Sequence, residues 1–332
     1  MKTAVVILNW NTVGYLRSFV PGILNSLGPD DRLIVADSGS TDGSLEMLQK
    51  EFPEVGRLPL GANFGFAGGY DKALEGLDAE YYLLLNSDIE VSSDWLAPLE
   101  EWMDSHPECA VCGPKLHALD PDGDGWKKTD RFEYAGAAGG RIDRFGYPFC
   151  RGRVLSKVEM DEGQYDLPAR VAWVTGAALM VRSSVWKELG GLDAEFFAHM
   201  EEIDFCWRVA LAGYQCWVVP QSVVYHIGGG TLPKESPLKL KLNFRNSLWM
   251  LRKNLPATIG GFRASLRIAF RRVLDLGSAL VYLVSGKKEF ARAIIEAHRE
   301  ADARKIVRSL AAAGRPEVLS GKMILLNYLR RR

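Results

Sequence analysis

Short apolar runs and amphipathic segments alternate through the first 115 residues. Almost every residue in the runs is hydrophobic, which is typical of strands buried on both faces. The segments between them repeat apolar residues at intervals of three and four, which predicts helices covering a sheet. A β-α-β-α-β series indicates an α/β fold with a parallel, doubly wound sheet. The predicted strands are residues 4–9, 32–38 and 81–88.

Polar residues stand at the end of each predicted strand. An open parallel sheet binds its ligand beyond the carboxyl ends of the strands. The residues at these ends are therefore the first candidates for a binding site. They are Asn9, Asn11, Asp37 and Asp88.

The pattern changes after the third strand. Residues 117–170 are irregular and contain many glycines, which predicts one or two β-hairpins and part of an acceptor surface. The following block predicts a strand, a short helix, a helix from about residue 201 to 212 and a final strand. Beyond about residue 240 the chain is helical and basic.

Charge separates this basic tail from the rest of the chain. The formal net charge is zero, but residues 245–332 contain 19 Lys and Arg against 6 Asp and Glu, while residues 1–244 contain 22 against 35. A basic tail on an acidic body indicates an anionic partner for the tail. Residues 262–284 combine Arg and large apolar residues at helical spacing, which suits an anionic membrane surface, a cap on the body, or both.

We therefore expect a catalytic domain and a helical extension. The boundaries are 1–243 for the catalytic domain, with a nucleotide-sugar-binding half at 1–115 and an acceptor half at 116–243, and 244–332 for the basic helical C-terminal extension.

Cysteine usage and hydropathy exclude several classes of protein. Cys109 and Cys112 form a lone C-x-x-C in an apolar context, so we expect buried strand thiols and a reducing cytosol. No apolar stretch reaches the ~18 residues of a membrane span. The N-terminal run stops at Asn9 without a cleavage site, which favours a first strand over a signal peptide. The acidic body lacks the stacking modules of a nucleic-acid-binding protein.

Two glycine-containing segments are candidates for nucleotide contact. Asp37 opens the sequence D-S-G-S-T-D-G-S, whose small residues form a tight turn and expose backbone N–H groups to a ligand. A strand–turn–helix junction with an Asp cap would have the same pattern. Further on, Gly65, Gly68 and Gly69 precede a helix and could approach a diphosphate closely. They do not form the G-x-G-x-x-G fingerprint of a dehydrogenase.

Asn86 and Asp88 follow three apolar residues at the end of the third strand. In an extended chain, the i, i+2 spacing points both side chains in the same direction. Mg²⁺ or Mn²⁺ is usually held by one or two carboxylates, a diphosphate and waters. His226 follows the last strand and lies beside a glycine run. A lone His is more often structural, but in one cleft with Asp88 it would complete a metal site.

Residues 199–208 place three carboxylates within four positions among Phe and Trp. Burying them without a purpose would be costly. On a helix, Glu201 and Asp204 share one face and Glu202 lies on another. An acidic helix start also favours the helix dipole, which is the structural alternative. An apolar environment can raise the pKa of a carboxyl group enough for it to act as a base.

Taken in order, these segments resemble the inverting glycosyltransferases of family 2, which have the GT-A fold, and the rhamnosyltransferase-like kind in particular. The resemblance covers about residues 3–256. The matching sequences are VVILNWN (5–11), DSGSTDGS (37–44), NFGFAGG (63–69), LLLNSDIE (83–90), WVTGAALMVR (173–182), GGLDAEFFAHMEEIDFCWR (190–208), HIGGGT (226–231) and RNSLWMLRKNLP (245–256).

The resemblance implies a Rossmann-like half that binds the donor. Asp37 would hold the nucleoside base, and Asn9 and Asn11 would line its pocket. Further residues would shape the nucleotide-sugar side of the site. These are Asn63, Gly65, Asn86 and Asp88.

It also implies the catalytic roles. Asp88 would bind a divalent cation, Mg²⁺ or Mn²⁺, with His226 as a second metal ligand. Glu202 would be the catalytic base. Residues that would contact the acceptor or support catalysis are Trp173, Gly176, Glu201 and Asp204.

This sequence departs from the family pattern at two positions. The family's D-x-D reads N-S-D here, so Asp88 is the only charged ligand of that element. The Glu-Asp pair reads Glu201-Glu202, which makes the base one methylene longer and leaves Glu201 and Asp204 as rivals.

We therefore expect a metal-dependent, inverting hexosyltransferase that acts in cell-surface polysaccharide assembly. A dTDP-linked deoxysugar such as rhamnose is the favoured donor and a UDP-hexose the second choice. The acceptor is a saccharide or a lipid-linked saccharide, at the inner face of the cytoplasmic membrane, with the protein bound peripherally. No nucleic acid partner is expected. The alternative is a non-catalytic nucleotide-sugar-binding module.

Overall fold

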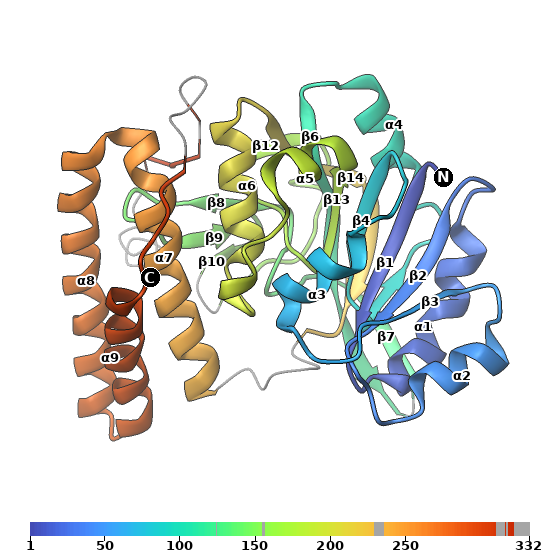
Figure 1. The fold of residues 1–332 in the computed structure, drawn as a ribbon, viewed down its shortest axis with the longest axis horizontal. Helices are drawn as coiled ribbons and strands as arrows, with labels where there is room; N and C mark the ends of the chain where they lie inside the picture. Colours follow the sequence, from blue (N-terminus) through green and yellow to red (C-terminus); the bar gives the residue numbers. More distant parts are fainter. Residues whose placement is uncertain (124, 155–156, 229–235, 310–315, 317, 322–332) are drawn as a thin grey trace.

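The computed structural model describes residues 1–332 except 124, 155–156, 229–235, 310–315, 317 and 322–332. In these described parts, a mixed ten-stranded sheet forms the centre and helices cover both of its faces (Figure 1). Three long helices at the C-terminal end of the chain pack beside this body.

The N-terminal half forms the parallel part of the sheet, as the hydrophobic pattern predicts. Four strands pair in parallel in the order β4-β1-β2-β3. Their bounds are β1 Thr3–Asn9, β2 Arg32–Asp37, β3 Gly56–Pro59 and β4 Tyr81–Leu85. The connecting helices are α1 Val13–Ser26, α2 Ser44–Glu51 and α3 Gly65–Leu74.

The third predicted strand is shorter than expected. Strand β4 ends at Leu85, and the chain then turns into β5 (Ile89–Val91). Asn86 and Asp88 therefore lie in a turn instead of an extended strand. The i, i+2 argument for their common direction fails for this reason. Their side chains nevertheless converge, because both approach the same histidine.

The second half extends the sheet with mixed pairing. Strand β13 is antiparallel to both β4 and β6, and β14 runs parallel to β6. Strand β12 pairs with β14 at the edge, and β7 forms a hairpin with β6. The bounds are β6 Cys109–Asp122, β7 Gly125–Phe132, β12 Ala169–Val171, β13 Ala178–Arg182 and β14 Gln215–His226.

The irregular segment contains the expected hairpin and also a small separate sheet. Its four strands lie in the order β11-β10-β9-β8 and pair antiparallel. The bounds are β8 Gly140–Ile142, β9 Pro148–Cys150, β10 Arg153–Val154 and β11 Lys157–Val158.

Two apolar layers lie on opposite faces of the large sheet. Val5 and Ile7 of β1 belong to one layer and Val6 to the other, because successive strand residues point to opposite faces. Helices α1, α2 and α4 (Ala97–Ser105) cover the first face. The second face is covered by α3, α5 (Ser183–Leu189) and α6 (Glu201–Leu211).

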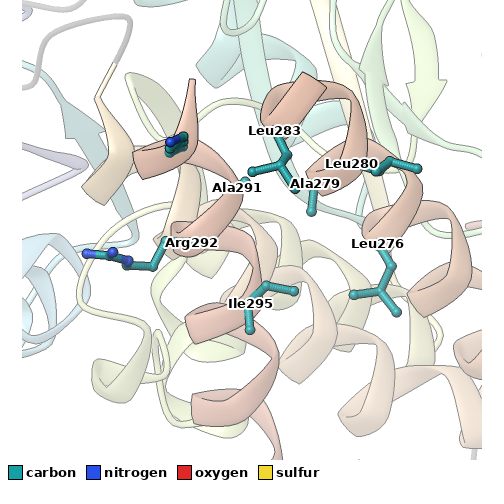
Figure 2. Close-up of a pocket in the computed structure, with 8 residues that line it drawn as sticks. Leu276, Ala279, Leu280, Leu283, Ala291, Arg292 and Ile295 are labelled. Carbon is teal, nitrogen blue, oxygen red and sulfur yellow. The ribbon is translucent and has the colours of Figure 1, made fainter. Parts of the chain in front are cut away.

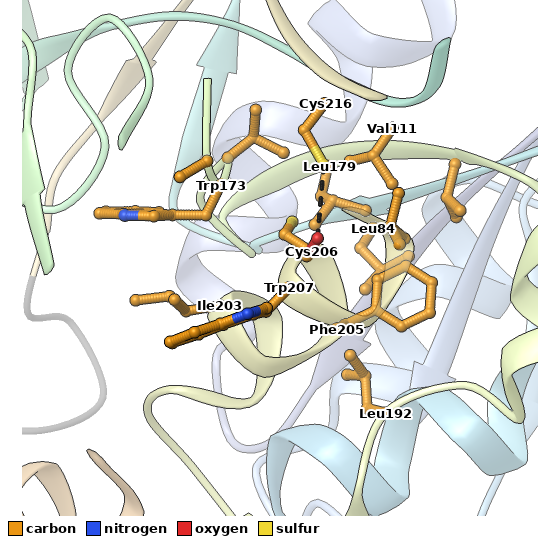
Figure 3. Close-up of a cluster of buried hydrophobic side chains, with 14 of the residues drawn as sticks. Leu84, Val111, Trp173, Leu179, Leu192, Ile203, Phe205, Cys206, Trp207 and Cys216 are labelled. Atoms are coloured by element: carbon orange, nitrogen blue, oxygen red, sulfur yellow. Dashed lines mark hydrogen bonds between the residues drawn. The ribbon is translucent and has the colours of Figure 1, made fainter. Parts of the chain in front are cut away.

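Figure 3 shows the second layer around α6, where Phe205 and Trp207 lie close to β-strand residues such as Leu84. Cys109 and Cys112 are buried, free thiols, as expected, and so are the other cysteines, Cys150, Cys206 and Cys216. Burying large aromatic side chains between α6 and the sheet fixes the position of the helix that carries the acidic cluster.

The C-terminal helices are α7 (Pro237–Ile259), α8 (Gly261–Val284) and α9 (Lys288–Ala303). Helix α7 is joined to α6 by polar contacts, such as the hydrogen bond from the Trp207 indole to the Thr258 hydroxyl (2.9 Å). Among the residues with described positions, no helix is long and apolar enough to span a membrane. The basic end of the chain (328–332) and residues 229–231 of the HIGGGT segment lie outside the described residues.

Candidate active site

The ends of β1 and β2 bring Asn9 and Asp37 together. The two residues are paired in the parallel register, and both are buried. The Asn9 amide donates to Asp37 Oδ1 (2.7 Å), and Asp37 Oδ2 accepts from the backbone N–H groups of Gly39 and Ser40 (3.2 and 2.9 Å). The two strand-end candidates thus lie side by side and hydrogen-bond to each other. Much of the hydrogen-bonding capacity of the Asp37 carboxylate is already used within the turn.

Asn11 and the following loop belong to the same edge. Asn11 is exposed and has φ of 55°, a left-handed conformation that Asn tolerates better than most residues. Its side-chain oxygen accepts from the Thr41 N–H (2.8 Å), and its own N–H donates to the Ser40 hydroxyl (2.9 Å). These bonds tie the loop after β1 to the loop after β2. We call Asn9, Asn11, Asp37 and Ser40 the donor edge.

The glycine segment before α3 packs closely against the loop before α6. Asn63 is exposed, and its side-chain oxygen accepts from the Gly65 N–H (2.8 Å). A Cβ on Gly65 would lie 2.5 Å from the carbonyl oxygen of Phe197, and the Phe66 N–H donates to that oxygen (2.7 Å). The first free N–H groups of α3 are thus already capped by the loop before α6.

Gly68 and Gly69 serve the same packing. A Cβ on Gly69 would come within 2.7 Å of the Leu8 side chain, and one on Gly68 within 3.2 Å of the Phe64 side chain. These two glycines allow α3 to approach β1 and its own N-terminal turn. Their predicted approach to a diphosphate stays a prediction.

A buried ionic cluster lies where β4 and β14 end. His226 Nε2 is 3.2 Å from Asp88 Oδ1 and 3.4 Å from the Asn86 amide nitrogen. On the other side of the ring, His226 Nδ1 is 3.6 Å from Glu133 Oε1. The structure thus brings Asn86, Asp88 and His226 together as expected and adds Glu133, which had no signal in its irregular segment.

The charges of this cluster are interdependent. Burial lowers the pKa of His226, but the carboxylates of Asp88 and Glu133 outweigh that effect and raise it to about 10. Burial raises the pKa of Glu133, and the charge of His226 more than compensates, so that the pKa falls below its ordinary value. In this arrangement His226 is an imidazolium that bridges two carboxylates.

The donor atoms of this cluster fit a divalent cation that is completed by a ligand. A carboxylate, an imidazole and an amide are donors suited to Mn²⁺, and Mg²⁺ commonly takes one or two carboxylates plus substrate phosphates. His226 Nε2 is the ring nitrogen that faces Asp88 and Asn86, so it would be the ligand atom. No group of three or more His, Cys, Asp or Glu among the described residues is arranged to hold a metal by itself. Asp88 and His226 would therefore be two ligands of a site that the donor diphosphate completes.

The loop before α6 has an unusual backbone. Phe197, His199 and Met200 have φ of 64°, 70° and 75°, values that are uncommon for residues with a side chain. Each such residue costs ~1–3 kcal/mol and persists only where the surroundings impose it. Met200 is the residue before α6, so this conformation determines how the first turn of α6, with Glu201 and Glu202, enters the site.

Glu201 and Glu202 carry buried carboxyl oxygens without partners. Within the described residues, Oε2 of each side chain is buried and has no hydrogen bond. Burial and the neighbouring Glu202 raise the pKa of Glu201 well above its usual range. Burial raises the pKa of Glu202 to about 7. The pKa of Glu202 thus lies close to neutral pH, where the carboxylate can accept a proton.

Asp204 has a different environment. It is completely buried, and its carboxylate accepts from Arg208 (2.9 Å), Lys253 (2.9 Å) and Asn254 (2.7 Å). The last two belong to α7. Asp204 therefore joins α6 to the C-terminal helices, and its lone pairs are used in doing so.

Asn246 of α7 holds the strained loop. It is fully buried, and its side-chain amide donates to the carbonyl oxygens of Phe196 (3.0 Å), Ala198 (2.9 Å) and His199 (2.8 Å). Sequence reasoning missed this function. The segment RNSLWMLRKNLP was noted as part of the resemblance, but nothing local indicated which carbonyls its Asn would reach.

Gly176 lies beside Glu202, whereas Trp173 is part of the core. A Cβ on Gly176 would lie 2.8 Å from the Phe66 ring and 3.6 Å from Cβ of Glu202, so the glycine keeps space beside Glu202. Trp173 is buried, donates to the Arg141 carbonyl (3.0 Å) and lies directly against Gly140. Its indole therefore belongs to the core and is not presented to a ligand.

The comparisons with known proteins agree with this arrangement. Residues 4–161 match the profile described as "Glycosyl transferase family 2". These residues belong to glycosyl transferase family 2. The match includes the donor edge, Asp88 and Glu133, while Glu202 and His226 lie beyond it.

One curated relative resembles most of the chain. It is the N-acetylglucosaminyl-diphospho-decaprenol L-rhamnosyltransferase of Mycobacterium tuberculosis (strain ATCC 25618 / H37Rv). The two are 25% identical over 288 residues, which cover 83% of this chain and 92% of the relative. An alignment of this length extends beyond residue 161, so the similarity reaches past the profile match.

Solved structures establish the GT-A fold of the transferase. S. aureus TarS 1–349 in complex with UDP-GlcNAc superposes with a TM-score of 0.54 at 16% identity, covering 91% of this chain and 83% of that one. The mannosyltransferase PcManGT from Pyrobaculum calidifontis, in complex with GDP-Man and Mn²⁺, gives 0.52 at 13% identity, covering 90% and 86%. At these identities the likeness concerns the fold alone.

Proposed function

We propose that the protein transfers a sugar from a nucleoside diphosphate to an acceptor hydroxyl with inversion at the anomeric carbon. The observation that carries this proposal is Glu202, whose buried carboxyl group has a pKa of about 7 and an oxygen without a partner. A general base works best when its pKa is near the operating pH. Burial and the neighbouring Glu202 raise the pKa of Glu201 well above its ordinary value as well.

The residues of the chain would divide the reaction between them. The donor edge would hold the nucleoside, with Asp37 and Asn9 on the base side. Glu202 would accept the proton of the acceptor hydroxyl. The oxygen of that hydroxyl would form the new bond to the anomeric carbon. The bond from that carbon to the diphosphate breaks in the same displacement, and the leaving group keeps the electron pair. A single displacement inverts the configuration.

A divalent cation, Mn²⁺ or Mg²⁺, bound by Asp88 and His226 would neutralise the charge of the diphosphate. His226 would have to lose the proton on Nε2, which faces Asp88, before that nitrogen could act as a ligand, while Nδ1 would keep its proton. Glu133 would then remain against the other ring nitrogen and orient the imidazole.

We propose a deoxysugar, rhamnose in particular, as the transferred group, with a dTDP-linked donor. The relative from Mycobacterium tuberculosis is an N-acetylglucosaminyl-diphospho-decaprenol L-rhamnosyltransferase, an enzyme named for a lipid-linked acceptor. A lipid-linked saccharide is therefore the acceptor that we favour, in polysaccharide assembly at the inner face of the cytoplasmic membrane.

Calorimetric binding of dTDP, UDP, GDP and NAD, each with and without Mn²⁺, tests the proposal. We expect tight binding of one nucleoside diphosphate that requires Mn²⁺, and no binding of NAD. Release of free sugar from the matching nucleotide sugar then distinguishes an enzyme from a binding module. Binding of none of the four by folded protein would contradict the proposal.

A further inference from the structure

Helix α8 buries charged residues and exposes large apolar ones, the opposite of an ordinary surface helix. Arg271 and Asp275 point inward and are almost completely buried, although they are the residues that water would solvate best. The Arg271 guanidinium donates to Asp275 (2.8 Å) and to the Gly146 carbonyl (3.1 Å), and the Tyr147 hydroxyl donates to Asp275 (2.9 Å). An internal ion pair thus fixes the inner face of the helix against the small sheet segment.

The large apolar residues of α8 point outward. They recur at intervals of three and four over the whole helix, and their exposed fractions are 46 to 80%. They are Phe262, Leu266, Phe270, Val273, Leu276, Leu280, Val281, Leu283 and Val284. We call these nine residues the α8 stripe. A water-soluble surface does not normally expose a contiguous apolar strip of this length, which at 1.5 Å per residue is ~36 Å.

The stripe continues into a groove between α8 and α9. Figure 2 shows Leu276, Leu280 and Leu283 on one side of this groove and Ala291 and Ile295 on the other. The groove has a volume of about 480 Å³, which is large enough for part of an acyl chain. Figure 1 shows α8 at the left end of the molecule, with α7 between it and the large sheet.

The charged residues around the stripe are predominantly cationic. Asp275 is the only acidic residue in the sequence of α8, and it is buried. Arg263 at the start of the helix is exposed, as are Lys287 and Lys288 after its end. Arg292 at the groove is exposed as well. The surface therefore combines an apolar strip with positive charge along its margins.

From this geometry we propose that α8 binds an anionic lipid bilayer, lying in the plane of the interface with the stripe inserted among the acyl chains. Such helices insert their apolar face while Lys and Arg contact anionic headgroups. A second copy of the chain fits this face less well, because a two-fold contact would bring the cationic margins of both copies together. The surface deepens the proposed function by naming the site of membrane contact, but it does not depend on the donor or on catalysis.

Co-sedimentation of the full-length protein with vesicles tests the proposal. The vesicles are phosphatidylcholine alone and phosphatidylcholine with 30% phosphatidylglycerol as probe mixtures, at low salt. The test variant is Val273→Gln/Leu280→Gln/Val284→Gln. The matched control, Leu167→Gln/Val307→Gln, replaces two residues that are 79 and 82% exposed outside α8.

We expect the wild type and the control to sediment with the anionic vesicles and much less with phosphatidylcholine alone. The stripe variant should bind at least ~10-fold more weakly, because each replaced side chain no longer moves apolar surface from water into the acyl chains. All of the exchanged side chains are exposed, so the thermal stability should remain that of the wild type.

Three outcomes would overturn the proposal. The first is a wild type that does not bind anionic vesicles, and the second is a stripe variant that binds as well as the control. The third is a stable dimer in light scattering that the stripe variant dissociates while vesicle binding is absent, since the face would then contact a second copy. Nucleoside diphosphate binding, measured in the same preparations, reports separately on the proposed transfer function.

Discussion

The donor edge and the acidic start of α6 satisfy their polar groups in opposite ways. At the donor edge, Asp37 and Asn9 hydrogen-bond to each other and to nearby backbone N–H groups. At the start of α6, carboxyl oxygens of Glu201 and Glu202 are buried without hydrogen bonds in the described structure. The backbone leading to them is held at positive φ.

Under the proposed function, the donor edge is a preformed binding surface, whereas Glu202 is a group that takes part in the reaction. Polar groups that are hydrogen-bonded to each other fix the local conformation and stay in one protonation state. A buried carboxyl group without a partner stays close to the balance between its two protonation states, at a cost in stability. Such a cost is expected where a protein departs from the local rules of folding for a functional reason. The following predictions are arranged to test this contrast.

The largest effect should come from Glu202→Gln. The amide keeps the shape of the side chain but cannot take a proton, so we expect transfer to fall by ~10²–10⁴-fold. The affinity for the nucleoside diphosphate should stay within a factor of two, because the donor edge is untouched. Single-turnover transfer and calorimetry measure the two quantities. Glu201→Gln is the matched control, since it makes the same exchange at the neighbouring position, and an equal loss there would contradict our choice of base.

Asp88→Asn should have the next largest effect. Removing the charged ligand should weaken Mn²⁺-dependent donor binding by ~10²-fold, because the diphosphate then lacks much of its counter-charge. Without metal, the wild type and Asp88→Asn should bind the nucleoside diphosphate with the same affinity. Calorimetry with and without Mn²⁺ makes the comparison. If Asp88→Asn kept the full metal effect, Asp88 and His226 would not be its ligands.

Asn246→Ala should reduce turnover without entering the site. Three carbonyls of the strained loop lose their donor, and a small displacement of the reacting group can cost ~10–10²-fold in rate. We expect kcat to fall while KM for the donor is nearly unchanged. Asn254→Ala is the control, since that buried amide on the same helix holds Asp204 instead. A similar loss of stability with a smaller loss of kcat in the control would separate positioning from folding.

The pH dependence should follow Glu202. Its pKa in the fold is about 7, so kcat/KM should fall about tenfold between pH 8 and pH 6 as the base becomes protonated. The raised pKa also means that the folded state favours the protonated form. This contribution to stability is complete below the ordinary Glu pKa and is lost as the pH rises to about 7. A wild-type rate that does not change between pH 6 and 8 would argue against Glu202 as the base.

Asp37→Ala should have the smallest effect on chemistry. It leaves the Asn9 amide and two backbone N–H groups without their acceptor, which should lower the free energy of unfolding by ~1–3 kcal/mol. Donor affinity should fall, while kcat at saturating donor should remain close to the wild-type value. Chemical denaturation and transfer kinetics measure these effects. A large loss of kcat at saturation would show that the donor edge takes part in the reaction, and the contrast between the two regions would fail.

The predicted helices and strands were largely correct because they depended on strong local patterns. Strands β1 and β2 are apolar on both faces, and the amphipathic segments after them could only cover a sheet. The end of β4 was misjudged because Asn86 and Asp88 turn toward His226, a contact between residues about 140 positions apart in the chain. A turn of this kind has no glycine or proline signal of its own.

The amino-acid sequence by itself determined the α/β fold, the position of Asn9 and Asp37 at the ends of strands, and the acidic start of α6. Each depends on hydrophobic periodicity or on polar residues at strand ends, which are local properties. The tertiary structure alone decided that Asp204 is an ion-pair partner of α7, that Glu133 joins His226, and that Asn246 holds the loop before Glu202. It also turned the apolar side of α8 outward, because the pKa, burial and pairing of a side chain depend on residues that only folding brings near.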